Sequence, residues 1–130
     1  REPQMRGGGV VFGPHKRNYR QKVSASSRNK ALCCVLSDRV RNDALRVLSE
    51  LECTEPKTKP FAEMLAHFRP KEGRTLVVTA EPSRAIVLSA RNIPRVAVRT
   101  AADVNVLDVL EAKCIVVADD ALAKLEERLS

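Results

Sequence analysis

The residues best suited to chemistry lie near the start of the chain, where glycines and basic side chains follow one another within a short segment. Three consecutive glycines, Gly7 to Gly9, precede a short apolar group that ends at Phe12. Basic residues follow at Lys16, Arg17, Arg20 and Lys22. Glycine lets the backbone approach another surface closely, and lysine and arginine bind phosphate oxygens. We expect a polyanion, and not the protein's own core, to order this segment.

Positive charge is concentrated in the first third of the sequence. Residues 1–46 carry eleven Lys or Arg and three Asp or Glu, which gives a net charge of +8. Residues 47–130 carry twelve Lys or Arg and thirteen Asp or Glu, which gives a net charge of −1. A near-neutral globule with a basic front end is typical of a nucleic-acid-binding protein. A solubilising tail is the alternative, but such a tail does not need three glycines and an apolar group. With four Phe or Tyr residues and no Trp, stacking on many bases is not expected to be the main binding mode.

Two nucleotide-binding motifs can be tested against the glycines. Gly8 and Gly13 have the spacing of the two P-loop glycines, but Pro14 and His15 stand where Lys and Ser or Thr are required. No predicted strand runs into a G-x-G-x-x-G sequence, so a dinucleotide fingerprint is absent as well. The sequence predicts no cofactor.

Acidic residues after the predicted strands supply the remaining enzymatic alternative. The five are Glu50, Glu81, Asp103, Asp119 and Asp120. At the carboxyl edge of a parallel sheet, such carboxylates could hold Mg²⁺. Acids also favour helix N-termini, where they cap the helix and meet the positive end of its dipole. We interpret these residues as helix caps, and we keep a small α/β enzyme or regulatory domain that uses them as the alternative function.

The cysteines and histidines do not have the spacing of a metal site. The four cysteines show no C-x-x-C pair, and the two histidines lie far from any cysteine pair; the residues are Cys33, Cys34, Cys53, Cys114, His15 and His67. We predict no zinc site, and we expect the cysteines at 33, 34 and 114 to be small buried residues in a reducing compartment. No apolar run reaches membrane length and no signal-peptide core is visible, so no membrane partner is expected. A small-molecule substrate is not expected either.

The apolar pattern after residue 22 predicts the elements that position these residues. Two helices are expected at 26–40 and 82–91. Three more are expected to begin at a cap residue: one at Thr58, one at Asp103 or Asn105, and one at Asp119. Ser26 or Ser27 is expected to cap the first helix. Strands are expected at 45–49, 75–79, 95–99 and 114–118, and their apolar runs suggest burial on both faces. We predict an α/β fold with a mostly parallel sheet of at least four strands covered by helices. The chain is expected to divide into an extended basic N-terminal arm at residues 1–22 and an α/β globular domain at 23–130.

Several motifs resemble those of one known family. They are RGGGVVFGP at 6–14, KALCCVLSDRV at 30–40, PKTKPF at 56–61, LSARNIPRVAV at 88–98, NVLDVL at 105–110 and ALAKLEERL at 121–129. In these motifs the chain resembles the bacterial and organellar family of ribosomal large-subunit protein four. The resemblance implies an α/β globule and a long loop that threads into large-subunit ribosomal RNA, with a tip that helps line the peptide exit tunnel. RGGGVVFGP would be the returning limb of that loop, so the chain would be the C-terminal part of such a protein, without the N-terminal strand and helix and without the loop tip.

The resemblance also implies partners and binding residues. It predicts a non-catalytic structural constituent of the large ribosomal subunit that contacts large-subunit rRNA and neighbouring ribosomal proteins. The predicted RNA-binding residues are Arg6, Gly7, Gly8, Gly9, Phe12, Lys16, Arg17, Arg20, Lys22, Arg28 and Lys30. The sequence departs from the family pattern at Ser24 to Ser27, where basic residues are usual. Ribosomes of an organelle, in particular a plastid, or of the bacterial cytoplasm are the expected location, with the departures favouring the organelle.

Overall fold

Helices and strands alternate from residue 25 to the end of the chain. The computed structural model describes residues 1–49, 51, 53, 56–68 and 73–129. The helices are α1 (Ala25–Arg41), α2 (Thr58–Ala66), α3 (Arg84–Ala90), α4 (Val106–Glu111) and α5 (Asp119–Leu129). The strands are β1 (Leu45–Leu48), β2 (Arg74–Thr79), β3 (Val96–Thr100) and β4 (Ala112–Ala118). These described strands form one sheet in the order β1-β4-β2-β3 with every pair parallel, so the predicted α/β class is confirmed.

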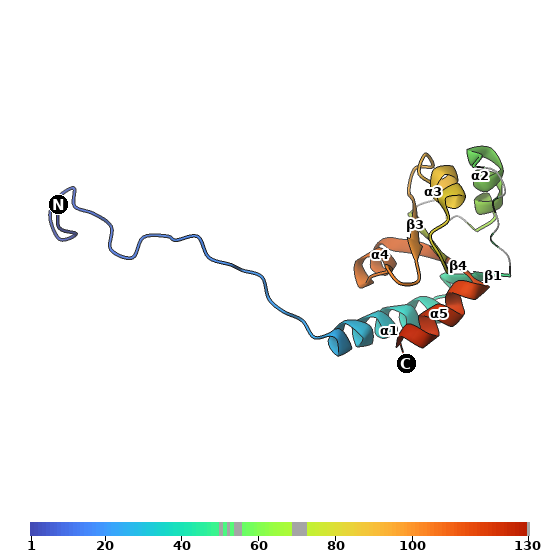
Figure 1. Ribbon diagram of the computed structural model, residues 1–130, viewed down its shortest axis with the longest axis horizontal. Coiled ribbons are helices and arrows are strands. Elements are labelled where there is room, and N and C mark those ends of the chain that lie inside the picture. The colour runs from blue at the N-terminus through green and yellow to red at the C-terminus, as the bar shows by residue number, and fades with distance from the viewer. Residues whose placement is uncertain (50, 52, 54–55, 69–72, 130) are drawn as a thin grey trace.

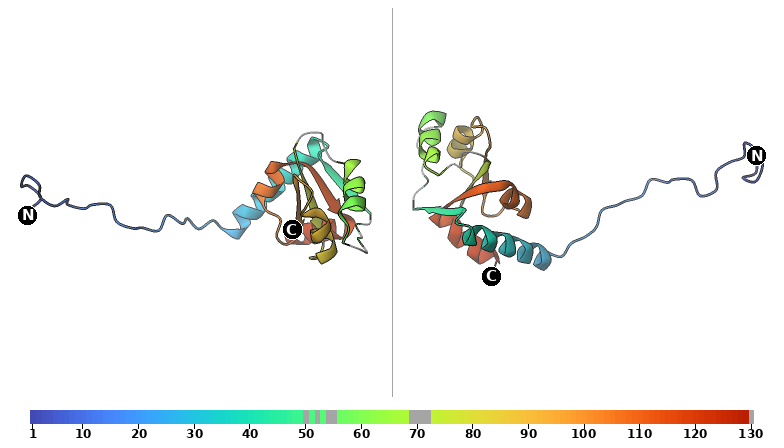
Figure 2. Two further views of the ribbon diagram at one scale, coloured as in Figure 1. Left: turned by 90° about the horizontal axis from the view of Figure 1, so that it is seen from above. Right: turned by 180° about the vertical axis from the view of Figure 1, so that it is seen from behind.

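The sheet lies between two layers of helices (Figures 1 and 2). Because successive side chains of a strand point to opposite faces, Leu76 and Val78 pack with residues of α1, α4 and α5, whereas Val77 packs with residues of α2 and α3. The same alternation in β4 sends Ile115 to the first layer and Val116 to the second. The central strands β2 and β4 are buried on both faces as expected, but the edge strands β1 and β3 are only half-buried.

Three of the predicted helix caps differ from the structure. Ser24, and neither Ser26 nor Ser27, caps α1: its Oγ accepts a hydrogen bond from Ser27 N at 3.2 Å. Thr58 is the first helical residue of α2, whose cap position holds Lys57 without a side-chain capping bond. Asp119 likewise is the first residue of α5, where it meets the positive end of the helix dipole without occupying the cap position.

Asn105, one of the two cap residues predicted for this helix, caps α4. Its Oδ1 accepts a hydrogen bond from Asp108 N at 2.8 Å. Asp103, the other candidate, instead accepts a hydrogen bond from the Thr100 hydroxyl at 2.8 Å, just after β3. The predicted acid at Glu50 lies outside the described residues.

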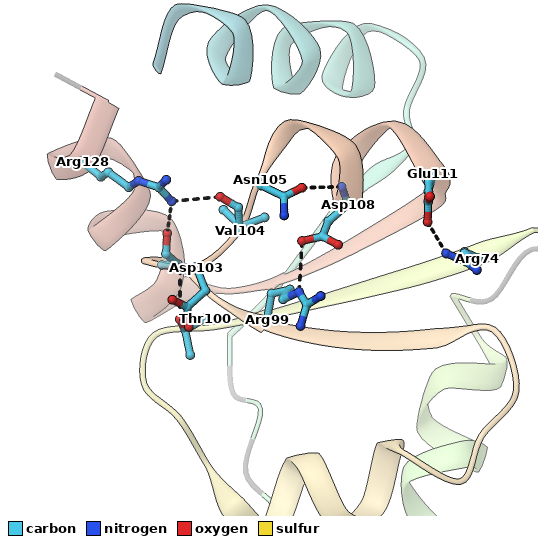
Figure 3. A network of polar contacts seen from close by, with 10 residues as sticks. Arg74, Arg99, Thr100, Asp103, Val104, Asn105, Asp108, Glu111 and Arg128 are labelled. Atoms are coloured by element: carbon cyan, nitrogen blue, oxygen red, sulfur yellow. Dashed lines mark hydrogen bonds and ion pairs between the residues drawn. The ribbon is translucent and has the colours of Figure 1, made fainter. Parts of the chain in front are cut away.

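A network of polar contacts fixes the short helix α4 to its neighbours (Figure 3). Arg99 of β3 binds the Asp108 carboxylate at 3.0 Å, and Arg74 of β2 forms an ion pair with Glu111. Arg128 of α5 donates to the carbonyls of Ala101 and Val104, at 2.8 and 3.1 Å, in the segment before α4. A helix of six residues has little stability of its own, so these contacts and the Asn105 cap hold it in place.

Replacing the α4 cap is expected to destabilise the globule. In Asn105→Ala, the N–H of Asp108 loses its acceptor, and we expect the free energy of unfolding to fall by about 0.5–2 kcal/mol. Asn105→Asp keeps a side-chain oxygen at the cap and serves as the matched control. Urea unfolding of both variants measures the difference, and equal stability of Asn105→Ala and Asn105→Asp would show that the cap contributes nothing.

Candidate nucleic-acid interface

The basic segment at the start of the chain has no helix or strand and runs away from the globule (Figure 1). All of its basic side chains are exposed: Arg1, Arg6, Lys16, Arg17, Arg20 and Lys22. Their ammonium and guanidinium groups are therefore accessible to phosphates. The role of this segment as an independent arm stays a prediction.

A tight turn at residues 1–9 explains two of the three glycines. Met5 N donates to Glu2 O at 3.0 Å, and Gly8 N donates to Met5 O at 2.8 Å. Gly7 has a φ of 70°, which glycine adopts without steric cost. A Cβ on Gly8 would lie 1.9 Å from Glu2 O, whereas a Cβ on Gly9 would have its nearest neighbour at 3.9 Å. The turn therefore requires glycine at positions 7 and 8 but not at position 9.

The apolar group that follows the turn is not packed against the globule. The side chains of Val10, Val11 and Phe12 are 84%, 56% and 95% exposed. Phe12 also has a φ of 52°, in the left-handed region, which costs a non-glycine residue about 1–2 kcal/mol. The apolar group is therefore exposed in the free chain, and Phe12 keeps a backbone conformation that is unfavourable for a residue with a side chain.

The two predicted contacts outside the segment lie on the first turns of α1. Arg28 and Lys30 are both exposed there. Arg28 lines a hollow of about 640 Å³ together with Asn29 of the same helix and Leu107 of α4. The structure therefore places these two cations next to the point where the basic segment joins the globule, and it keeps the other nine predicted residues on the segment itself.

Sequence reasoning missed one aromatic side chain in the basic segment. Tyr19 is 75% exposed, and the Arg17 guanidinium carbon lies 4.6 Å from the centroid of its ring. Arg20 N donates to Asn18 Oδ1 at 2.9 Å in the same stretch. The spacing of Arg17 and Tyr19 could have indicated this contact. Side chains two residues apart lie on the same side of an extended chain.

The interpretation of the strand-end acids as helix caps is wrong for Glu81, because Ser83 caps α3. A hollow of about 760 Å³ at the carboxyl edge of the sheet is lined by Glu81 and Asp120, among others. Lys124 Nζ lies 2.9 Å from Glu81 Oε1, and this hydrogen bond holds the pKa of the Glu81 carboxyl below its ordinary value. Within the described part of the chain, no three His, Cys, Asp or Glu side chains are grouped closely enough to hold a metal ion.

The cysteines only partly follow the prediction. Cys114 of β4 is buried, and this burial raises the pKa of its thiol. Cys34 is exposed and Cys33 half-buried, so the prediction that both are buried is wrong. The reason is their position on α1, where Leu32, Val35 and Leu36 supply the face that packs on the core and Cys34 points to solvent. None of the described helices combines the length and the apolar character needed to cross a membrane.

Comparisons with known proteins identify the family. The model of the ribosomal protein L4/L1 family matches residues 1–128. Large ribosomal subunit protein uL4 of Clostridium botulinum (strain Eklund 17B / Type B) is 40% identical over 127 residues, which are 98% of this chain and 61% of that protein. The protein of the same name from Brevibacillus brevis is 40% identical over 130 residues, 100% of this chain and 62% of that protein. The chain thus spans about three fifths of the length of these curated relatives. The resemblance seen in the motifs is confirmed, and the chain belongs to the ribosomal protein L4/L1 family.

Proposed function

We propose that this chain is a structural, non-catalytic constituent of the large ribosomal subunit that binds and stabilises large-subunit rRNA. The observation that carries the proposal is the exposed basic segment of residues 1–22 in a chain whose relatives are named as large-subunit proteins. Both of these relatives are bacterial, which favours a bacterial ribosome over the organellar one that the sequence departures favoured.

Binding by the segment would work mainly through charge. Its cations are not folded onto the globule, and Glu2 is the only acidic residue before Asp38. Lysine and arginine that meet phosphates release counterions, and this release supplies much of the affinity of such contacts. Arg28 and Lys30 would extend the same contact onto α1, so that both the segment and the start of the helix bind the RNA.

The apolar group would be buried in the same assembly. We expect Phe12, which is exposed in the free chain, to enter a pocket of rRNA or of a neighbouring ribosomal protein. Residues 6–14 would form the returning limb of the family's long loop, on the path towards the peptide exit tunnel. Domain roles follow from this: residues 1–22 bind rRNA, and residues 23–130 form the globule that anchors them.

The enzymatic alternative has no comparable support among the described residues. Glu81 is paired with Lys124, and Asp103 accepts a hydrogen bond from Thr100. Asp119 and Asp120 lie in the first turn of α5, where the helix dipole stabilises a negative charge. Glu81 and Asp103 thus contact neighbouring side chains, and Asp119 and Asp120 lie where acids commonly stabilise a helix.

Removing cations from the segment should weaken RNA binding and reduce its dependence on salt. If about five cations meet phosphates, the log–log slope of affinity against salt concentration should be roughly −3 to −5. Arg17→Gln combined with Arg20→Gln should reduce the steepness of this slope by about one to two. Filter binding of large-subunit rRNA fragments at several salt concentrations measures the slope for each variant.

The matched control removes two exposed cations from the globule, in Lys59→Gln combined with Arg84→Gln. This control should keep the slope of the unmodified chain. Equal slopes for the two double variants, or full affinity after deletion of residues 1–22, would contradict the proposed RNA-binding role of the segment.

The turn at residues 1–9 provides a second test. Gly8→Ala would place a Cβ against Glu2 O and open the turn, whereas Gly9→Ala has room for its Cβ. We expect Gly8→Ala to lower the affinity for rRNA by about fivefold or more, equivalent to about 1 kcal/mol, and to reduce incorporation into large subunits. The melting temperature of the globule should not change in either variant, because residues 1–9 do not pack on it. Equal RNA affinity of Gly8→Ala and Gly9→Ala would show that the turn does not contribute to binding.

A further inference from the structure

We propose that Tyr19, with the Arg17 guanidinium packed against its ring, is a stacking site for one unpaired RNA base. This inference rests on the proposed rRNA-binding function, and it adds a base contact to an interface so far described by phosphate contacts. Composition argues against stacking on many bases, because the chain has only four Phe or Tyr residues and no Trp. A single stacking site is compatible with that composition.

The local geometry places the two side chains together without help from the globule. The guanidinium carbon of Arg17 lies 4.6 Å from the centroid of the Tyr19 ring, within the range of a cation–π interaction. Between them, Asn18 Oδ1 accepts a hydrogen bond from Arg20 N at 2.9 Å. Such a bond from an asparagine side chain to the backbone two residues on is an Asx turn, which restricts the backbone locally. Arg17 and Tyr19 are therefore oriented by their immediate neighbours in the sequence.

The ring of Tyr19 remains available to a ligand. Its side chain is 75% exposed although Arg17 lies against it, so much of the aromatic surface still faces solvent. A nucleic-acid base stacks on such a surface because each base has a flat π face. Arginine on the ring would extend the arrangement into a column of guanidinium, phenol and base, which is a common way for proteins to hold an unpaired RNA base.

The charges around Tyr19 select a polyanion as the molecule that carries the base. Lys16 precedes the pair, and Arg20 and Lys22 follow it. All three are exposed, so each can reach a phosphate of the same strand. The base must be unpaired, because in a regular RNA helix the base faces are covered by stacked neighbours and the major groove is too narrow for side chains.

The amino-acid composition supplies a direct probe of this contact. Tyr19 is the only tyrosine and the chain has no tryptophan, so the intrinsic fluorescence of the protein reports on Tyr19. We expect single-stranded large-subunit rRNA fragments to quench this fluorescence at saturating concentration, because a stacked base quenches an aromatic ring. A fully paired RNA duplex of the same length should bind through phosphates and leave most of the fluorescence unchanged.

Substitutions separate stacking from charge. Tyr19→Phe keeps the ring and should bind single-stranded RNA within about twofold of the unmodified chain, whereas Tyr19→Leu should lose about 5- to 150-fold in affinity. Tyr19→Leu removes no cation, so its salt slope should equal that of the unmodified chain. Arg17→Lys keeps the charge but not the planar group, and it should weaken binding of single-stranded RNA more than binding of the duplex.

The outcomes distinguish this inference from the function on which it rests. RNA binding with the expected salt slope, together with unchanged tyrosine fluorescence and full affinity of Tyr19→Leu, would overturn the stacking site and leave the proposed function intact. Equal quenching by the single strand and the duplex would also overturn it. If no rRNA fragment binds the unmodified chain at low salt, the proposed function itself fails.

Discussion

The structure depends on a contrast between a globule that can bury its apolar residues and a leading segment that cannot. Fixing the backbone of one residue costs about 1–2 kcal/mol, and that cost must be met by burial or by bonds to another molecule. In the globule, the central strands β2 and β4 are covered on both faces by helices. In the leading segment, Phe12 and Tyr19 stay exposed, and the described hydrogen bonds are local ones within residues 1–9 and 18–20. Contacts with a polyanion can supply the missing stabilisation.

The basic segment joins the globule at helix α1. Helix α1 carries Arg28 and Lys30 at the end where the segment begins, and it packs on the sheet through Leu32. The Ser24 cap starts the helix directly after the segment, so the change from irregular chain to helix occurs within one residue. The polar network around α4 stabilises the same layer of helices (Figure 3).

Much of the globule could be predicted from the sequence because its strongest signals are local. The apolar runs at 75–79 and 114–118 predicted the two central strands, and the helix expected from Asp119 is α5. The strand order β1-β4-β2-β3 was beyond reach, since hydrophobic periodicity shows which residues are buried but not which strands pair. The cap of α1 was misplaced because 24–27 offers three serines, and the choice among them depends on the backbone conformation at Ser24.

The candidate interface was predictable in charge but not in shape. Basic residues between 6 and 30 could be read directly from the sequence, and the structure keeps them exposed. The reason for Gly8 could not be read in the same way, because it is the approach of Glu2 O, six residues earlier, across a turn. The contact between Arg17 and Tyr19 was not predictable from composition, because a chain with one tyrosine and no tryptophan gives little indication of stacking.

We propose that residues 1–22 have no stable fold of their own in the free chain and gain fixed order from RNA. Amide hydrogen exchange of the free chain and of the chain in assembled large subunits tests it most directly. We expect fast exchange from Gly7 to Arg20 in the free chain, alongside slow exchange in β2 and β4, and slowing of the segment by more than about tenfold in the subunit. Slow exchange from Gly7 to Arg20 in the free chain would contradict the claim, because the segment would then be ordered without RNA.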